Sequence, residues 1–115
     1  MEKIKVYGIP NCDTTKKALN LLKENKTEFD FHDYKQEGIS KAKLEEWSKQ
    51  AGWETIFNKR STTWKELSEA EQKKVIDQAS AIKTMIVHNS IIKRPIIETG
   101  KNLIIGFKEK EIKDL

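Results

Sequence analysis

The segment KIKVYGIPNCDTT, residues 3–15, decides the fold of this chain. Residues 3–7 alternate between polar and apolar side chains, which predicts a strand with one buried face. Gly8 and Pro10 break that strand and mark a turn. A helical pattern of apolar residues then runs from Asp13 to about Glu24. The sequence therefore predicts a strand, a turn that carries a cysteine, and a helix.

The rest of the chain extends this unit in both directions. Residues 28–34 alternate again, so the first 34 residues predict a parallel βαβ unit with a right-handed crossover. Residues 38–88 predict a mainly helical insert. The chain then returns to strands at about 95–99 and 103–107, joined by a tight turn at Gly100-Lys101-Asn102, and ends in a short helix at 108–115. The order βαβ, insert, ββα is that of an α/β thioredoxin-like fold in one domain, residues 1–115.

Two pairs of residues in the predicted insert have the spacing of capping boxes. They are Thr63 with Glu66 and Ser68 with Glu71. In a capping box the first hydroxyl and the later carboxylate each bind a backbone N–H at the start of a helix. Helices are therefore predicted to begin near residues 63 and 68.

Composition limits the kind of protein. At 115 residues, with 37% hydrophobic and 35% charged residues, the chain is typical of a globular protein. No apolar stretch approaches the roughly 20 residues of a membrane span, and we expect no membrane association. The N-terminal residues form no signal-peptide core, and one cysteine cannot form an internal disulfide. The expected location is the cytoplasm.

The basic residues are dispersed rather than clustered. The net charge is +4, but the lysines are mixed with 18 acidic residues, and we expect no direct nucleic-acid binding. Of the 22 basic residues only Arg60 and Arg94 are arginine. Arginine binds oxyanions through a planar fork that lysine lacks. The two arginines are therefore the first candidates for an anion site. His32 and His88 are too isolated from other ligand types to predict a metal site.

Cys12 is the candidate reactive group. A thiol at a helix N-terminus lies near unpaired amides and the positive end of the helix dipole, which lower its pKa. Thr15 lies on the same turn and could donate its hydroxyl to the sulfur. The carboxylate of Asp13 disfavours a thiolate, unless it caps the helix and points away. The alternative is an inert cysteine that is merely a small residue at a helix start. Because residue 15 is threonine, no second thiol can resolve a mixed disulfide, so redox cycling needs an external thiol.

Several motifs together resemble the arsenate reductase-like (ArsC) family over essentially the whole chain. They are Asn11-Cys12-Asp13-Thr14-Thr15-Lys16-Lys17-Ala18, Asn58-Lys59-Arg60-Ser61-Thr62-Thr63-Trp64-Lys65, Lys93-Arg94-Pro95-Ile96-Ile97 and Gly106-Phe107-Lys108-Glu109. The resemblance is closer to the bacterial branch that includes the YffB and Spx/MgsR proteins than to arsenate reductases proper. It implies the thioredoxin-like fold with a helical insert.

The resemblance also implies a site. The catalytic candidates are Cys12 as nucleophile with Arg60 and Arg94 lining the anion site, and the candidates for substrate or glutathione binding are Asn11, Asp13, Thr14, Thr15 and Pro95. Pro95 matches a cis-proline that faces the cysteine loop. Phe107 stands near the position of a third arginine in arsenate reductases proper. Loss of one charge-assisted bond there costs about 1.5–3 kcal/mol. Thr15 replaces the second cysteine of the Spx redox switch.

Three functions follow from these residues. The leading hypothesis is a glutathione-dependent thiol oxidoreductase with no bound cofactor, served by glutathione or a glutaredoxin-like reductant. The first alternative is an Spx-like transcriptional regulator that contacts RNA polymerase without catalysis. The second alternative is a true arsenate reductase. A monomer is expected in each case.

Overall fold

The structure, a computed structural model, describes residues 4–100 and 102–115. Lys3 of the predicted first strand and Lys101 of the predicted turn lie outside these ranges. The chain forms two compact units. The sheet unit consists of the residues up to Glu37 together with Arg94–Leu115, and the helical unit is Gly38–Lys93. The predicted insert, about 38–88, falls within the helical unit.

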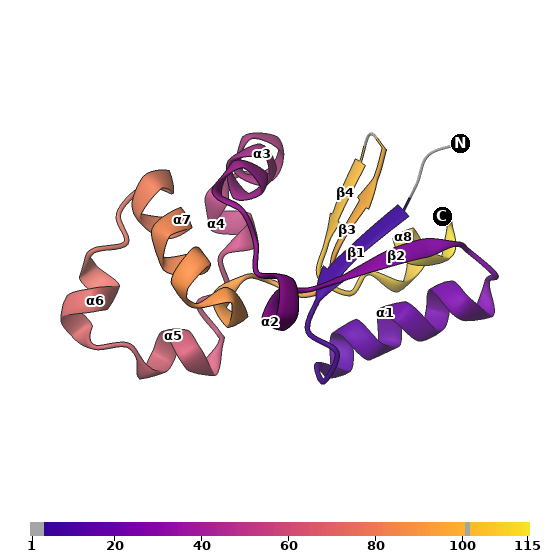
Figure 1. The fold of residues 1–115 in the computed structure, drawn as a ribbon, viewed down its shortest axis with the longest axis horizontal. Coiled ribbons are helices and arrows are strands. Elements are labelled where there is room, and N and C mark those ends of the chain that lie inside the picture. Colours follow the sequence, from indigo (N-terminus) through magenta and orange to yellow (C-terminus); the bar gives the residue numbers. More distant parts are fainter. Residues whose placement is uncertain (1–3, 101) are drawn as a thin grey trace. The chain divides into compact units, whose positions relative to one another are not determined.

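The sheet unit carries four strands and three helices (Figure 1). In chain order these are β1 (Ile4–Gly8), α1 (Asp13–Glu24), β2 (Phe29–Asp33), α2 (Tyr34–Glu37), β3 (Ile96–Thr99), β4 (Asn102–Ile105) and α8 (Glu109–Lys113). The sheet order is β2-β1-β3-β4. Strand β1 pairs parallel with β2 and antiparallel with β3, and β3 pairs antiparallel with β4. The predicted parallel βαβ unit and the closing ββα order are confirmed.

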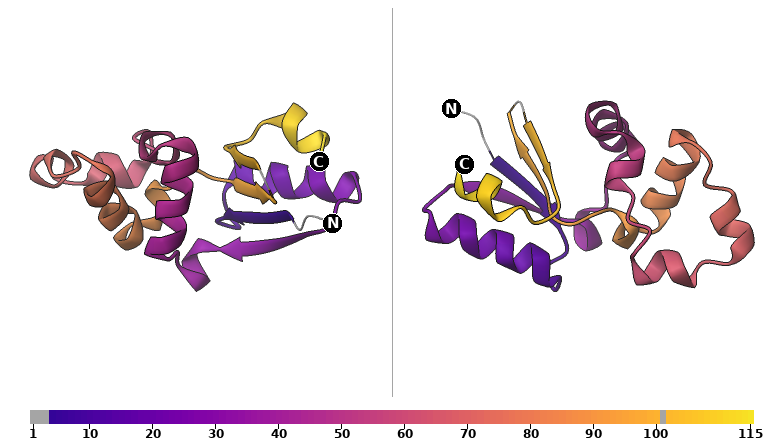
Figure 2. Two further views of the ribbon diagram at one scale, coloured as in Figure 1. Left: turned by 90° about the horizontal axis from the view of Figure 1, so that it is seen from above. Right: turned by 180° about the vertical axis from the view of Figure 1, so that it is seen from behind.

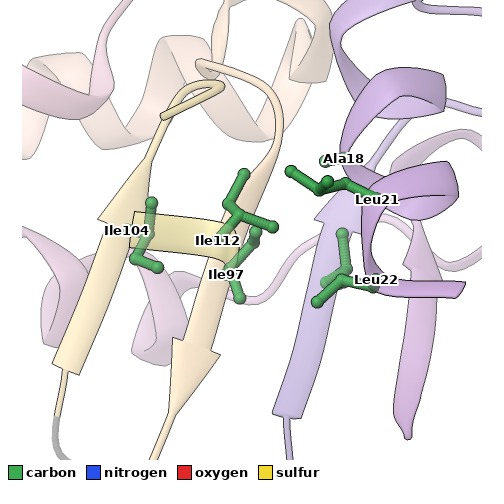
Figure 3. Packing of buried hydrophobic residues seen from close by; sticks show 7 residues of the cluster. Ala18, Leu21, Leu22, Ile97, Ile104 and Ile112 are labelled. Carbon is green, nitrogen blue, oxygen red and sulfur yellow. The ribbon is translucent and has the colours of Figure 1, made fainter. Parts of the chain in front are cut away.

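One face of the sheet holds the core of this unit. Val6 is paired with Phe31 on one side and Ile97 on the other, and Ile97 is paired with Ile104. Paired residues of neighbouring strands point to the same face, so these side chains form a row across the sheet. Helices α1 and α8 cover that face (Figure 2). Figure 3 shows the side chains that meet there, Ala18, Leu21, Leu22, Ile97, Ile104 and Ile112. This packing fixes the axis of α1 against β1.

The helical unit consists of short helices around a small core of its own. In chain order these are α3 (Lys41–Ala51), α4 (Trp53–Ile56), α5 (Thr62–Glu66), α6 (Glu69–Lys73), α7 (Gln78–Val87) and the 3-10 helix η1 (Asn89–Ile91). Leu44 and Trp47 of α3 and Met85 of α7 are completely buried. The Phe57 ring packs edge-on against both Trp53 and Trp64.

One of the two predicted capping boxes is wrong. Ser68 and Glu71 do form a capping box at the start of α6. At α5, however, the N-cap is Ser61, whose Oγ accepts the Trp64 N–H at 3.1 Å. Ser61 has the extended backbone that an N-cap needs, at φ −65° and ψ 146°. Thr63 already lies inside the helix, and its hydroxyl instead contacts the Ser90 hydroxyl at 2.6 Å.

Gly8, the last residue of β1, is packed directly against Thr15 of α1. A Cβ added at Gly8 would lie 2.7 Å from Thr15 Oγ1 and 2.9 Å from Thr15 Cγ2. Both residues are buried, and Thr15 is completely so. The close approach of strand and helix therefore requires glycine at position 8.

We predict that Gly8→Ala lowers the free energy of unfolding by about 1–3 kcal/mol, because the new methyl group overpacks a buried contact. Thr15→Ala removes both side-chain atoms that the methyl group meets, so the double variant should lose less stability than the sum of the two single variants. Urea denaturation of the four proteins measures this coupling. Additive losses would show that Thr15 is not the obstacle.

Candidate functional site

Cys12 is the N-cap residue of α1. Its backbone is extended, at φ −90° and ψ 127°, and its carbonyl accepts the first helical hydrogen bond from the Lys16 N–H at 2.9 Å. The Cys12 N–H donates to the Ile9 carbonyl at 3.0 Å, which closes the turn after β1. The thiol is half-buried. It therefore lies at the amino end of a twelve-residue helix and remains within reach of a reagent.

The Thr14 hydroxyl lies between the Cys12 thiol and the backbone of Arg94, which precedes strand β3. Its Oγ1 lies 3.1 Å from Cys12 Sγ and donates to the Arg94 carbonyl at 3.2 Å. A hydroxyl has one proton, so while Thr14 donates to the carbonyl it can only accept a hydrogen bond from the neutral thiol. Once Cys12 ionises, the sulfur needs a donor, and the Thr14 proton must turn from the carbonyl to the thiolate. Ionisation of Cys12 is thus coupled to the contact at Arg94.

The pKa of the Cys12 thiol is lowered from 9.0 to about 6. Burial is the largest single influence and acts in the opposite direction, raising the pKa. Hydrogen bonds from the side chains of Thr14, Thr15 and Arg94 outweigh it. The Thr15 N–H does not form a full capping bond to Sγ, yet it also lowers the pKa. Cys12 is therefore largely a thiolate at neutral pH.

Thr15 holds a buried hydroxyl beside this sulfur. Its side chain is completely buried, and its Oγ1 forms no hydrogen bond of normal geometry with any described residue. A buried hydroxyl without a partner is costly. The thiolate is the acceptor that it can serve, which agrees with the lowering of the Cys12 pKa by the Thr15 side chain.

Arg94 and Pro95 form the wall beside the cysteine loop. The Arg94–Pro95 peptide bond is cis, as the sequence predicts. Pro95 is buried, and its carbonyl accepts the Gly106 N–H at 2.8 Å. Burial raises the pKa of Tyr34 well above its usual range, and the positive charge of Arg94 partly offsets this effect. Arg94 therefore acts on both the thiol and a buried phenol.

The other predicted site residues are placed differently. Asn11 is exposed in the turn, and Asp13 is exposed in the first turn of α1. The alternative that Asp13 caps the helix is wrong, because Cys12 occupies the cap position. Arg60 is exposed in the helical unit, just before the start of α5, and its N–H donates to Asn58 Oδ1 at 3.0 Å. Its proximity to the thiol stays a prediction.

Two contributions were missed by sequence reasoning. The bridge from Thr14 to the Arg94 carbonyl spans 80 positions, and no local spacing indicates it. The sequence predicts that Gly8 breaks the strand, and in the structure it is the last residue of β1 and makes room for Thr15. Phe107, by contrast, packs against the core of the sheet unit. Residue 107 therefore serves packing in this chain.

No group of three or more histidine, cysteine, aspartate or glutamate side chains that could hold a metal ion occurs among residues 4–100 and 102–115. Within the same ranges, no helix combines the length and the apolar character that crossing a membrane requires.

Cys12 is the one cysteine of the chain. The chemistry of the described site is therefore that of a thiolate with hydroxyl, amide and guanidinium donors.

A four-stranded mixed sheet, a cis-proline beside it and a thiol at the start of α1 define a thioredoxin-like α/β protein. Residues 7–115 match the ArsC family. The chain belongs to this family. An uncharacterised protein of Haemophilus influenzae is 44% identical over 108 residues, which is 94% of each chain.

Solved structures agree with the assignment. A YFFB protein is 43% identical, with a TM-score of 0.90 over 95% of each chain. An arsenate reductase (ArsC) related protein from Brucella melitensis is 37% identical, with a TM-score of 0.76 over 97% of this chain and 92% of that one. An arsenate reductase from Vibrio cholerae is 18% identical, with a TM-score of 0.82 over 98% and 97% of the two chains, and shares the fold.

We predict that the alkylation rate of Cys12 by iodoacetamide follows a titration with a midpoint near pH 6, matching the lowered pKa. Thr14→Val removes the hydroxyl at nearly constant size, so its midpoint should move up toward 9.0, the ordinary value. Thr14→Ser keeps the hydroxyl and should stay close to the parent protein. Equal midpoints for the valine and serine variants would contradict the role of the Thr14 hydroxyl.

Cys12 should also make stability depend on pH. Its pKa is about 6 in the folded protein and near 9.0 when unperturbed, so the unfolded chain binds more protons between these values. The stabilisation by the thiolate is therefore complete above about pH 9 and is lost as the pH falls to about 6. We predict that, as the pH rises from about 6 to about 9, the free energy of unfolding of the parent protein increases relative to that of Cys12→Ser. A constant difference would contradict the lowered pKa.

Proposed function

We propose that this chain is a glutathione-dependent monothiol oxidoreductase of the ArsC family, working in the reducing cytoplasm. The observation that carries the proposal is a half-buried thiol at the start of α1 whose pKa is lowered to about 6. A thiolate is the nucleophilic form of cysteine. An inert structural cysteine needs neither the hydroxyl donors nor the low pKa.

The proposed cycle has two displacements. In the first, the substrate is a mixed disulfide between glutathione and a thiol, and the Cys12 thiolate attacks its glutathione sulfur. The substrate sulfur leaves as a thiolate, and Cys12 becomes glutathionylated. In the second, a glutathione thiolate attacks the glutathione sulfur on Cys12, which releases glutathione disulfide and restores the Cys12 thiolate. Each step breaks one S–S bond and forms another, so electrons balance. Thr15 in place of a cysteine makes the external thiol necessary. A glutaredoxin-like protein is a second candidate reductant.

Anion binding is the role proposed for the two arginines. Arg94 supports this directly, because its side chain hydrogen-bonds the sulfur and lowers the pKa of Cys12. Such a guanidinium can also bind a glutathione carboxylate. Arg60 is proposed as its counterpart on the strength of the family motif. The exposed residues Asn11, Asp13 and Thr14, with Thr15 and Pro95, are proposed to surround the bound glutathione.

Arsenate reduction is the weaker proposal. Phe107 packs against the core, so no arginine stands at that position to bind the arsenate anion. The similarity to the arsenate reductase from Vibrio cholerae, at 18% identity, is one of fold alone. A regulator that contacts RNA polymerase without catalysis makes no use of the low thiol pKa.

Glutathionylation tests the proposal. The reduced protein is incubated with glutathione disulfide at neutral pH, and the mixed disulfide is measured by mass spectrometry. Turnover of a glutathione mixed-disulfide peptide is then followed with excess glutathione. We expect modification of Cys12, steady turnover, and complete loss of both with Cys12→Ser. Arg94→Gln should raise the KM for the peptide about tenfold, as expected for one lost charge-assisted hydrogen bond.

The matched control is Lys17→Gln, which removes one positive charge from an exposed position of α1. It should leave KM nearly unchanged. Absence of the mixed disulfide and of turnover would overturn the proposal. In that case, turnover of arsenate with glutathione would favour the reductase, and capture of RNA polymerase that survives Cys12→Ser would favour the regulator.

A further inference from the structure

The strongly exposed large apolar side chains of the described residues gather in one short stretch. They are Ile76, Ile86 and Val87, exposed by 77%, 42% and 74%. The sequence pattern places Ile86 on the inner face with Ile82 and Met85, but only these two are buried. Ile76 precedes the amino end of α7, whereas Ile86 and Val87 are neighbours at its carboxyl end, and such a neighbouring exposed pair needs an explanation. The stretch from Ile76 to Val87 is essentially helix α7 and the residues that lead into it.

A pocket of about 240 Å³ adjoins this stretch, entirely within the helical unit. Val87 belongs to both the exposed stretch and the pocket lining, and Leu67 provides a second apolar wall. Lys74 and Lys83 also line the pocket. The result is a concave apolar surface with two ammonium groups at its border, which we call the α7 pocket.

The charges of the α7 pocket are available to a partner. Elsewhere in the helical unit lysines pair with glutamates, as Lys73 does with Glu69 at 3.2 Å. Lys74 and Lys83 form no ion pair with any described residue. Glu71 also lines the pocket, but its one carboxylate stands against the two ammonium groups of Lys74 and Lys83. The uncompensated charge at the pocket is therefore positive.

The spacing along α7 suits a helical ligand. Lys83 and Val87 are four residues apart and so lie on the same side of the helix, about 6 Å from each other along its axis. A partner helix that places an apolar side chain over Val87 brings a residue one turn away close to Lys83. An acidic residue at that position would gain both an ion pair and the burial of its apolar neighbour.

We propose that the α7 pocket binds an acidic amphipathic helix of a partner protein. An apolar side chain of the helix fills the pocket between Leu67 and Val87, and its carboxylates pair with Lys74 and Lys83. A second copy of this chain fits poorly, because each copy carries a net charge of +4.

This binding does not depend on the proposed function. Cys12 and Arg94 belong to the sheet unit, whereas every residue that lines the α7 pocket belongs to the helical unit. Variants at the pocket should therefore leave the alkylation rate of Cys12 unchanged. Failure of either proposal leaves the other standing.

The test uses a fluorescein-labelled sixteen-residue peptide with leucines on one helical face and glutamates on the other. Fluorescence anisotropy should show saturable binding to the full chain. Val87→Asp, at an exposed position that tolerates a polar residue, should weaken binding at least about tenfold. The double variant Lys74→Glu with Lys83→Glu should do the same. The matched control, Lys41→Glu with Lys49→Glu, makes the same charge change at exposed positions of α3 and should weaken binding much less.

A second peptide, with lysine in place of each glutamate, should not bind. The proposal is overturned if the acidic peptide does not bind, if Val87→Asp binds as well as the parent protein, or if the α3 control loses as much as the pocket variant. Analytical ultracentrifugation that detects a dimer abolished by Val87→Asp would assign the surface to a second copy instead. Flotation with anionic phosphatidylserine vesicles that is lost in Val87→Asp, without peptide binding, would assign it to a membrane.

Discussion

The contact of Thr15 with Gly8 is the constraint on which the thiol site depends. It brings the start of α1 so close to the end of β1 that a single methyl group at residue 8 would collide with Thr15. The same helix is held further along by Ala18 and Leu22 in the core. With both contacts made, the position of Cys12 at the amino end of α1 follows from the packing of the helix. The site needs no disulfide or metal to hold the nucleophile in place.

A buried hydroxyl without a hydrogen-bond partner ordinarily lowers the stability of a folded protein, and the Thr15 hydroxyl at the contact with Gly8 is such a group. The Cys12 thiolate can accept a hydrogen bond from this hydroxyl. The energetic cost of burying the hydroxyl therefore falls when Cys12 loses its proton. Thr14 adds a second hydroxyl that must choose between the sulfur and the Arg94 carbonyl. The folded chain thus favours the thiolate through the Thr15 hydroxyl, which has no partner while the thiol is neutral, and through Thr14, which can turn its proton to the sulfur. This is why burial, which alone raises the pKa, does not prevail.

Much of this arrangement is readable from local sequence. Alternation, glycine and proline predict the first strand, the helix from Asp13 to Glu24 and the hairpin near the end, and the structure has all three, with the first strand extended to Gly8 and the last strand at Asn102–Ile105. Features that depend on contacts between residues far apart in the chain could not be predicted from the sequence. The Thr14 bond to Arg94 needs the sheet order. The N-cap of α5 is Ser61, and Thr63 instead contacts Ser90, 27 positions further along the chain. Exposure of Ile86 depends on how α7 packs, since helical spacing alone places it inward.

Phe107 shows how packing limits the chemistry. Its side chain lies against the core cluster that includes Ile112. Phe107 is partly buried, so an arginine at this position would give up that apolar contact to keep its guanidinium in solvent. The core and a third cationic clamp therefore compete for the same residue.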